Sequence, residues 1–245
     1  MNAIINLLKN HVTVRQFNTN TTLTQQEIDD IIASSKQAAS WMNGQAYSII
    51  VFKDEDKQQL VDLLSQTERN QTNAKIIESA SLFLLYCLDF NQYFIENNVL
   101  SDSTVEPVLI ATTDASLALQ NAVVAAESLG LHTCIIGGIR NDMDKLIAAL
   151  NLPQHVFPFV SVAIGKALQV SPPKPRLSHD VNVHYGFNYN TPQRQDVDLY
   201  TEQLSEYSKQ QNYTSDDWVE RFQKFYENKR YPSQTESLLK QQDLL

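Results

Sequence analysis

Residues 132–142 read HTCIIGGIRND and combine a strand pattern, a turn and the start of a helix. The apolar run HTCII predicts a short buried strand, and NDMDKLIAALN, which begins at Asn141, has helical spacing. Between them stand Gly137 and Gly138, two of the six glycines in a chain of 245 residues. A glycine pair at such a junction is typical of a tight turn, or of bare backbone that a flat ring or a phosphate approaches closely. The third glycine of a dinucleotide-binding fingerprint is missing, which disfavours that motif.

The segments around this junction alternate between helical and strand patterns. Residues 22–40 contain Thr24 and Glu27, a capping box in front of an amphipathic helix. SLFLLYCLDF, residues 81–90, is apolar on both faces and predicts a central strand covered on two sides. Further strands are predicted for YSIIVFKD and FPFVSVAIG, and further helices for KDEDKQQLVDLLSQT and for residues 105–129, with Gly130 as the C-cap glycine. This alternation up to residue 165 predicts a layered α/β or α+β domain.

The composition and periodicity of the sequence change after residue 165. Residues 166–190 are irregular and punctuated by prolines, and from residue 191 onward the chain has no glycine and is rich in Gln, Tyr and Lys. Helical spacing persists in DVDLYTEQLSEYSKQQ, SDDWVERFQKFYE and SQTESLLKQQ. Such a polar extension buries too little apolar surface to form a core of its own. We therefore expect a core domain over residues 1–190 and a helical extension over residues 191–245 that packs on the core or on a partner subunit.

Charge and composition disfavour several classes of protein. With a net charge of −9 the chain shows no basic stripe for a nucleic-acid backbone. The long apolar stretch of residues 108–131 is interrupted by Asp114 and Glu127, which predicts a buried helix rather than a membrane span. Cys87 and Cys134 stand inside apolar runs and are expected to be reduced core thiols. The N-terminal stretch lacks the basic region of a secretory signal, so we expect a cytoplasmic protein.

The sequence contains none of the common hydrolase motifs. Gly-x-Ser-x-Gly, Walker, His-Glu-x-x-His and Cys-x-x-Cys patterns are absent. His179 and His184 form the one close histidine pair, and without another soft ligand nearby we expect them on a solvated strand or loop rather than at a metal. Because no acid–base or nucleophile set is visible, the protein is either not an enzyme or an enzyme whose cofactor supplies the reacting atoms.

Two other stretches suit an anionic, planar ligand. In HVTVR, the side chains of His11, Thr13 and Arg15 alternate with valines, so an extended chain places them on one face. In PPKPR, a stiff proline-rich backbone carries Lys174 and Arg176 without acidic neighbours. Taken alone, the first stretch is equally well an edge strand with a surface arginine, and the second is more simply a rigid linker.

Together these pieces occur in a familiar order along the chain: HVTVRQF, AASWMNGQAYSIIVF, SLGLHTCIIGGIRND, LNLPQHVFPFVSVAIG and PPKPRL. The order resembles the nitroreductase superfamily, specifically its NADPH-dependent oxygen-insensitive nitroreductase and flavin reductase group, over residues 3–180. The resemblance implies a homodimeric α+β flavoprotein with FMN bound at the subunit interface. Its fold would have a central mixed, mainly antiparallel sheet flanked by helices, with a helical C-terminal extension.

Carried over position by position, the resemblance implies a set of cofactor contacts. The N-terminal flavin motif corresponds to His11, Thr13 and Arg15, and the loop facing the flavin to Ser40, Met42 and Gln45. A later amide contact corresponds to Asn73, and the backbone against the isoalloxazine to Ile136, Gly137 and Gly138. The two cations that hold the flavin phosphate or ring edge correspond to Lys174 and Arg176. Arg221 and Arg230 are the candidates for gripping NADPH. The chain departs from the family at Val12, where an arginine is common, and in the loop SWMNGQ, where Trp41 and Met42 bear on substrate choice.

The function that the resemblance implies is an FMN-dependent NAD(P)H oxidoreductase. Hydride would pass by a ping-pong mechanism to nitroaromatics, quinones or free flavin, with no catalytic side chain and no metal required. Two alternatives stay open: a non-catalytic flavin-binding or storage protein, and a narrower reductase acting on azo compounds, chromate or halogenated substrates. The helix expected at residues 105–129 is apolar on more than one face, which independently predicts a dimer.

Overall fold

The structure, a computed structural model, describes residues 2–96, 99–100, 105–214 and 217–245. Contacts divide the chain into two compact units, Met1–Val170 with Pro232–Leu245, and Ser171–Tyr231. This division begins earlier than the boundary expected after residue 190. The end of the chain, Pro232–Leu245, belongs to the first unit.

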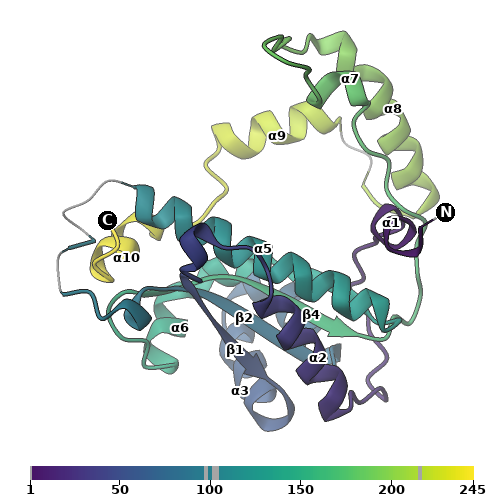
Figure 1. Ribbon diagram of the computed structural model, residues 1–245. Helices are drawn as coiled ribbons and strands as arrows, with labels where there is room; N and C mark the ends of the chain where they lie inside the picture. The colour runs from purple at the N-terminus through teal and green to yellow at the C-terminus, as the bar shows by residue number, and fades with distance from the viewer. Residues whose placement is uncertain (1, 97–98, 101–104, 215–216) are drawn as a thin grey trace. The chain divides into compact units, whose positions relative to one another are not determined.

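The first unit is built on a four-stranded antiparallel sheet (Figure 1). The strands are β1 (Tyr47–Phe52), β2 (Leu82–Asp89), β3 (His132–Ile136) and β4 (Val156–Gly165), arranged in the order β1-β2-β4-β3. Each neighbouring pair is antiparallel. β2 is an inner strand and is buried along nearly its whole length, as its two-sided apolar pattern predicts. The predicted α+β class with a mainly antiparallel sheet is therefore confirmed.

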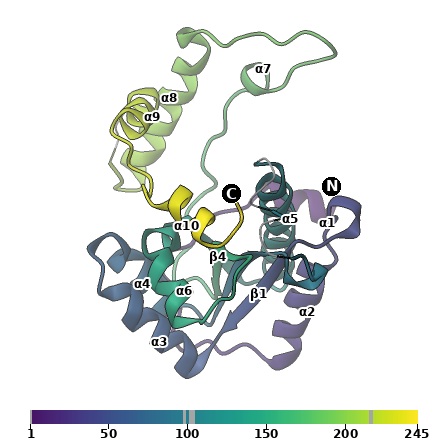
Figure 2. The same ribbon diagram turned by 90° about the vertical axis from the view of Figure 1, so that its left-hand side faces the viewer.

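Helices cover both faces of this sheet (Figure 2). One face carries α2 (Gln25–Lys36) and α5 (Glu106–Ser128), and the other carries α3 (Asp54–Ser65), α4 (Gln71–Ser79) and α6 (Met143–Ala149). Alternate side chains of β2 enter two different cores, because neighbouring residues of a strand face opposite ways. Leu84 belongs to the core beneath α5, whereas Phe83 and Leu85 belong to the core beneath α3 and α4. The sequence patterns did not predict α4.

The predicted ends of two helices are confirmed in detail. Thr24 and Glu27 form the reciprocal hydrogen bonds of a capping box at the start of α2. α5 ends one residue before Leu129, and Gly130 follows with a φ of +72°. There the Leu131 N–H donates to the carbonyl of Ala126, which is the Schellman arrangement that glycine favours.

α5 is apolar on its outer flank as well as on its buried face. By length and composition alone it is apolar enough to cross a membrane, but it packs across the sheet and against α2. Leu109 and Leu117 nevertheless leave 51% and 44% of their surface exposed. A helix packed against one core needs apolar residues on one face only, so this second apolar face requires a separate explanation.

Two short helices complete the first unit. α1 (Ala3–Lys9) is capped by the Asn2 side chain, contacts α5 and buries none of its residues, although it carries Ile4, Ile5 and Leu8. α10 (Thr235–Gln241) places Leu238 and Leu239 in the core beneath α5. The 3-10 turns of this unit are η1 (Trp41–Asn43), η2 (Glu68–Asn70), η3 (Asn91–Tyr93) and η4 (Gly137–Asp142).

The second unit is made of helices with little core. Its elements are α7 (His179–Asn182), α8 (Arg194–Gln210) and α9 (Trp218–Glu227). Arg194 joins α8 to the start of α9 by an ion pair with Asp217, and the rings of Tyr200 and Trp218 meet edge to face at 5.3 Å. The helices predicted in the tail are confirmed, except that residues 215 and 216 lie outside the described part of the chain.

Candidate functional site

The segment from His11 to Arg15 lies along the edge strand β3. Thr13 forms a parallel bridge with Thr133, and the Val14 N–H donates to the Thr133 carbonyl at 2.9 Å. Val14 points into the core with 5% of its surface exposed, while Thr13 and Arg15 point outward. The predicted alternation of faces is therefore confirmed, although the segment makes an isolated bridge rather than a full strand.

Two side chains beside this bridge share one carboxylate. His11 Nδ1 lies 2.6 Å from Glu127 Oε1, and the Thr133 hydroxyl donates to the same oxygen at 3.3 Å. Glu127 stands in the last turns of α5, so it ties the N-terminal segment and β3 to that helix. These contacts fix the orientation of the His11 ring.

Arg15 lies near the end of β3 that leads to the glycine pair. Its positive charge acts on the buried thiol of Cys134: burial raises the pKa of that thiol, and Arg15 partly opposes the rise. Among the residues that the structure describes, Arg15 forms no hydrogen bond or ion pair. The predicted N-terminal motif and the predicted glycine junction are thus brought together by β3.

The two glycines of the junction have different surroundings. A Cβ added at Gly137 would meet the end of the Arg140 guanidinium at 3.4 Å, an ordinary contact with a flexible group. A Cβ added at Gly138 would overlap the Nδ2 atom of Asn73. The φ of Gly138 is not in the left-handed region, so the constraint at this position is space: a β-carbon would force the Asn73 amide, which is bonded to Asn70, to move. The predicted amide contact of Asn73 and the predicted glycine contact lie side by side, and Ile136 is anchored next to them because its carbonyl accepts a bond from Ser161 at 2.9 Å.

A buried polar network continues behind Asn73. The Asn73 amide donates to Asn70, and Asn70 donates to the Asp142 carboxylate. Burial by itself would raise the pKa of Asp142, but hydrogen bonds from Thr67, Asn70 and Lys145, together with the charge of Lys145, hold it below the ordinary value. The network therefore keeps an ionised carboxylate inside the protein beside the glycine junction.

The loop that carries Ser40, Met42 and Gln45 is held by Asp114. This α5 side chain, with 1% of its surface exposed, accepts backbone hydrogen bonds from Trp41 at 2.9 Å and from Ala46 at 3.2 Å. Between them Met42, Asn43 and Gln45 have φ values of 50°, 57° and 58°, a left-handed conformation that non-glycine residues rarely adopt. Met42 is exposed over 81% of its surface, and the buried Ser40 hydroxyl oxygen has no hydrogen-bond partner in the part of the chain that the structure describes.

Within one chain this loop and the His11 segment are held at different places on α5. The loop is held by Asp114 and His11 is held by Glu127. Asp114 lies 13 residues before Glu127 on the helix. At 1.5 Å per residue the two anchors are about 20 Å apart along the helix. The structure thus places His11, Thr13 and Arg15 along β3 and Asn73 beside the glycine turn that follows this strand. It holds the loop with Ser40, Met42 and Gln45 away from the His11 end of α5.

The remaining predicted cations belong to the second unit. Lys174 lies over the Tyr213 ring at 5.7 Å, and Arg176 donates to the carbonyls of Lys174 and Pro175. Arg221 lies over the ring of Phe222, and Arg230 is exposed. Of the histidine pair, His179 is exposed at the start of α7 and bonds the Tyr185 hydroxyl at 2.8 Å, while the half-buried His184 has its ring 4.4 Å from that of Tyr189 at a tilt of 41°.

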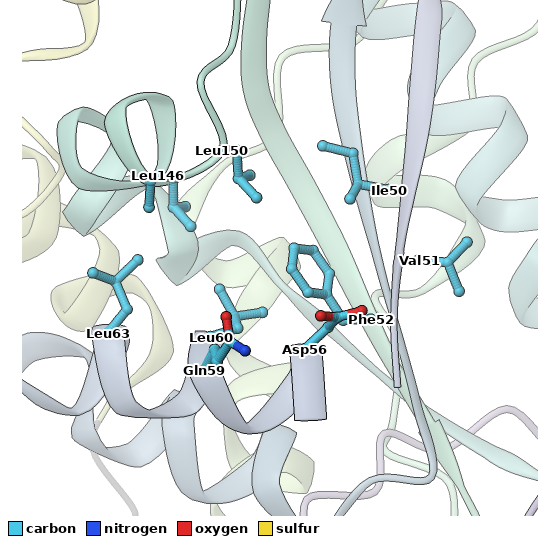
Figure 3. Close-up of a pocket in the computed structure, with 10 residues that line it drawn as sticks. Ile50, Val51, Phe52, Asp56, Gln59, Leu60, Leu63, Leu146 and Leu150 are labelled. Carbon is cyan, nitrogen blue, oxygen red and sulfur yellow. The ribbon is translucent and has the colours of Figure 1, made fainter. Parts of the chain in front are cut away.

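Two cavities of the first unit flank the edge strand β1. One of about 430 Å³ lies between α3, β1 and α6 (Figure 3) and is lined mainly by Ile50, Phe52, Leu60, Leu63, Leu146 and Leu150, with Asp56 and Gln59 as its polar residues. No residue expected at the cofactor site lines it. A second hollow of about 470 Å³ includes Lys36, Gly44, Gln45 and Gln92, so it adjoins the Asp114-clamped loop. The glycine junction lies on neither cavity.

The sequence patterns missed the residues that hold the site in place. In the sequence Asp114 and Glu127 are visible only as polar interruptions of an apolar helix. That pattern is the available signal for them, because a buried carboxylate needs partners. Asn141–Asp142 was interpreted as the start of a helix. α6 does begin at Met143, but the Asp142 side chain does not cap it. The hydrogen bonds of Asn70 and Asp142 cross more than 70 residues of chain and leave no local pattern.

Comparison with known proteins shows the family of the chain. Residues 8–166 match the model of the nitroreductase family. An FMN reductase [NAD(P)H] of Bacillus subtilis is 33% identical, with 98% of each chain aligned, and an oxygen-insensitive NADPH nitroreductase of Salmonella typhimurium is 30% identical, also over 98% of each chain. Among solved structures, B. megaterium NfrA2 superposes with a TM-score of 0.85 at 33% identity, covering 99% of this chain and 98% of that one. The chain belongs to the nitroreductase family.

Proposed function

We propose that the protein is an FMN-dependent NAD(P)H oxidoreductase that reduces nitroaromatics, quinones or free flavin. The observation that carries the proposal is that the Arg15 segment pairs with β3 and that Asn73 lies against Gly138 in the turn directly after the same strand. Relatives matched over nearly the whole chain are named FMN reductase and NADPH nitroreductase, which supports the same cofactor and donor.

The residues present are suited to a planar, anionic group. Arg15 is an outward cation without a protein partner among the described residues, and an arginine keeps its charge at any relevant pH. The Ser40 oxygen is a buried polar atom without a hydrogen bond from the described residues, and such atoms are usually satisfied by a ligand or water. Gly137, in the turn that follows β3, offers backbone without a side chain.

FMN, when bound, would supply the chemistry of hydride transfer between NAD(P)H and the acceptor. The work left to the chain is to hold and orient the reactants. Arg15 stabilises negative charge, the Asn73 amide and the residue 136–138 backbone position the ring, and His11, fixed by Glu127, extends the polar face. No protonating side chain is needed, because solvent can protonate the reduced acceptor. Lys174 and Arg176 remain candidates for the anionic parts of the flavin, and Arg221 and Arg230 for NADPH.

We further propose that the protein is a homodimer whose sites are shared between subunits. The exposed apolar side chains of α5 and of α1 gather on surfaces that one chain leaves uncovered, including Leu109, Leu117 and Ile5. A two-fold axis across α5 would set the two copies of the helix antiparallel. The Asp114-clamped loop of one subunit would then approach the His11 end of its partner, which brings Ser40, Met42 and Gln45 to the flavin.

The finer assignments follow from these proposals. Trp41 and Met42 would form an apolar surface over the flavin that suits flat, aromatic acceptors. The polar C-terminal extension would pack on the core or on the partner subunit. A cytoplasmic location agrees with two buried cysteines that form no disulfide.

Chromate reduction is the second candidate activity, because a CR(VI) reductase of Pseudomonas is 32% identical over 92% of this chain.

Turnover separates these functions. The proposal predicts that protein freed of flavin takes up FMN and then oxidises NADPH or NADH continuously when a quinone or nitroaromatic is supplied. FMN uptake without turnover on any acceptor would instead indicate a binding or storage protein. Turnover confined to chromate would indicate the narrower reductase, and a protein that takes up no FMN would refute the proposal.

A further inference from the structure

A relay of side-chain amides links Asp142 to Asn73. The Asn70 Nδ2 atom donates to Asp142 Oδ2 at 2.6 Å, and the Asn73 Nδ2 atom donates to Asn70 Oδ1 at 2.7 Å. Asn70 is fully buried, and Asp142 leaves only 2% of its surface exposed. The relay therefore runs through the interior from the end of η4 to α4, and it ends where Asn73 lies against Gly138.

The relay has one allowed direction, because its first member can only accept. An ionised carboxylate has no proton to donate, so Asn70 must turn its Nδ2 atom toward Asp142. The Oδ1 atom of Asn70 then faces Asn73, which must donate a hydrogen bond to it from its own Nδ2 atom. The Oδ1 atom of Asn73 is left as the outer acceptor, and it accepts no hydrogen bond from the residues that the structure describes.

The surroundings keep the first member ionised. Thr67 donates to Asp142 Oδ1 at 2.6 Å, and the Lys145 ammonium lies 3.0 Å from the same atom. Although burial opposes the charge, these donors and the Lys145 charge hold the pKa of Asp142 below its ordinary value. Asp142 precedes α6 but makes no capping hydrogen bond to it, so helix capping does not account for a carboxylate at this place.

We infer that Asp142 and Asn70 are positioning residues that decide which atom of the Asn73 amide is offered to the cofactor, namely the acceptor Oδ1. The inference rests on the proposed function, in which Asn73 lies beside FMN. The isoalloxazine has one ring N–H, at N3, between two carbonyl acceptors. An amide with its oxygen outward suits that N–H, whereas an amide with its nitrogen outward would suit the carbonyls.

A pair of ligands tests this orientation directly. FMN and 3-methyl-FMN differ at the N–H in question, so the ratio of their dissociation constants reports whether an acceptor faces that atom. We expect the protein, freed of its flavin, to bind FMN about tenfold more tightly, as the loss of one buried hydrogen bond implies. In Asp142→Asn, position 142 can donate or accept, the relay loses its direction, and the ratio should fall toward one.

Asp144→Asn is the matched control. Asp144 lies two residues further on, is exposed, and has no part in the relay, so this variant should keep the wild-type ratio. An unchanged ratio in Asp142→Asn, or a wild-type protein that does not discriminate between the two flavins, would overturn the inference while leaving FMN binding intact. Failure of the wild type to bind either flavin would instead overturn the proposed function, and the inference with it.

A second experiment needs no flavin and covers the case in which Asp142→Asn folds poorly. Asn73→Asp places an acceptor against the Asn70 oxygen and should lower the melting temperature of the full chain. In the double variant Asn73→Asp with Asp142→Asn the carboxylate and the amide exchange ends, so Asn70 can reverse and satisfy both. We expect the double variant to melt above the value obtained by adding the two single effects. Additive or larger losses would show that the relay has no direction to reverse.

Discussion

The side-chain amide of Asn73 lies against the backbone of Gly138, in the space that a β-carbon at position 138 would take. The second glycine of the junction is therefore required by a neighbouring side chain rather than by an unusual backbone angle. This contact links the glycine pair to Asn73 and, behind it, to the buried carboxylate of Asp142.

Gly138→Ala should be far more damaging than Gly137→Ala. The added methyl at 138 displaces the Asn73 amide and breaks its bond to Asn70, which costs about 1–3 kcal/mol of stability and should weaken FMN binding. At 137 the methyl meets only the end of a flexible arginine. Thermal melts and FMN titrations of both variants check this. Equal behaviour of the two would mean that Asn73 does not depend on the missing side chain.

Much of the fold was predictable because its causes are local in sequence. The two-sided apolar pattern of residues 81–90, the capping box of Thr24 and the glycine after α5 each act within a few residues. α4 was missed because its apolar positions, Ala74, Ile76 and Ile77, are too few to show a period. The Asp142 network was missed because its partners meet only through the tertiary fold.

The candidate site was only partly predictable for the same reason. Alternation in HVTVR correctly placed Val14 inside and Arg15 outside, since strand periodicity is a local property. The pairing of that segment with β3 and the contact between Asn73 and Gly138 are long-range, and they entered only through the family resemblance and the structure.

Arg15→Ala should lose FMN. If the guanidinium makes a charge-assisted hydrogen bond to the flavin, its removal costs about 1.5–3 kcal/mol, or at least about tenfold in the dissociation constant. Arg69→Ala removes an exposed arginine outside the proposed site and serves as the control. The comparison is made by quenching of flavin fluorescence. Equal retention of FMN in the two variants would remove Arg15 from the cofactor site.

The shared-site dimer predicts complementation between two defective variants. Asp114→Asn turns an N–H donor toward one of the backbone amides of Trp41 and Ala46, so it should release the loop and lower activity. Arg15→Ala damages the other half of the site. A mixed dimer then contains one site with both defects and one with neither.

Mixing the two variants under conditions that exchange subunits should therefore restore part of the wild-type activity. Each variant taken through the same exchange by itself is the control and should recover nothing. Activity that stays at the level of the separate variants, in a sample shown by native mass measurement to contain mixed dimers, would place all of the site within one chain.

Asp142 should make a pH-dependent contribution to stability. Its pKa is lower in the folded protein than the ordinary value of about 3.9, so the folded state holds the proton more weakly than the unfolded chain does. The contribution is complete above the ordinary pKa and is lost as the pH falls through the lower folded value. The stability difference between wild type and Asp142→Asn, from urea unfolding at several pH values, should be constant near neutrality and shrink below about pH 4. A constant difference throughout that range would mean that the carboxylate is not stabilised in its ionised form.

The most direct test of the account is an anaerobic titration of the purified protein with NADPH and with NADH, followed through the visible absorbance of the bound flavin. We expect a yellow protein whose absorbance bleaches on adding one equivalent of donor per site and returns on adding a quinone. A colourless protein that takes up no FMN, or a flavin that neither donor bleaches, would contradict the central claim.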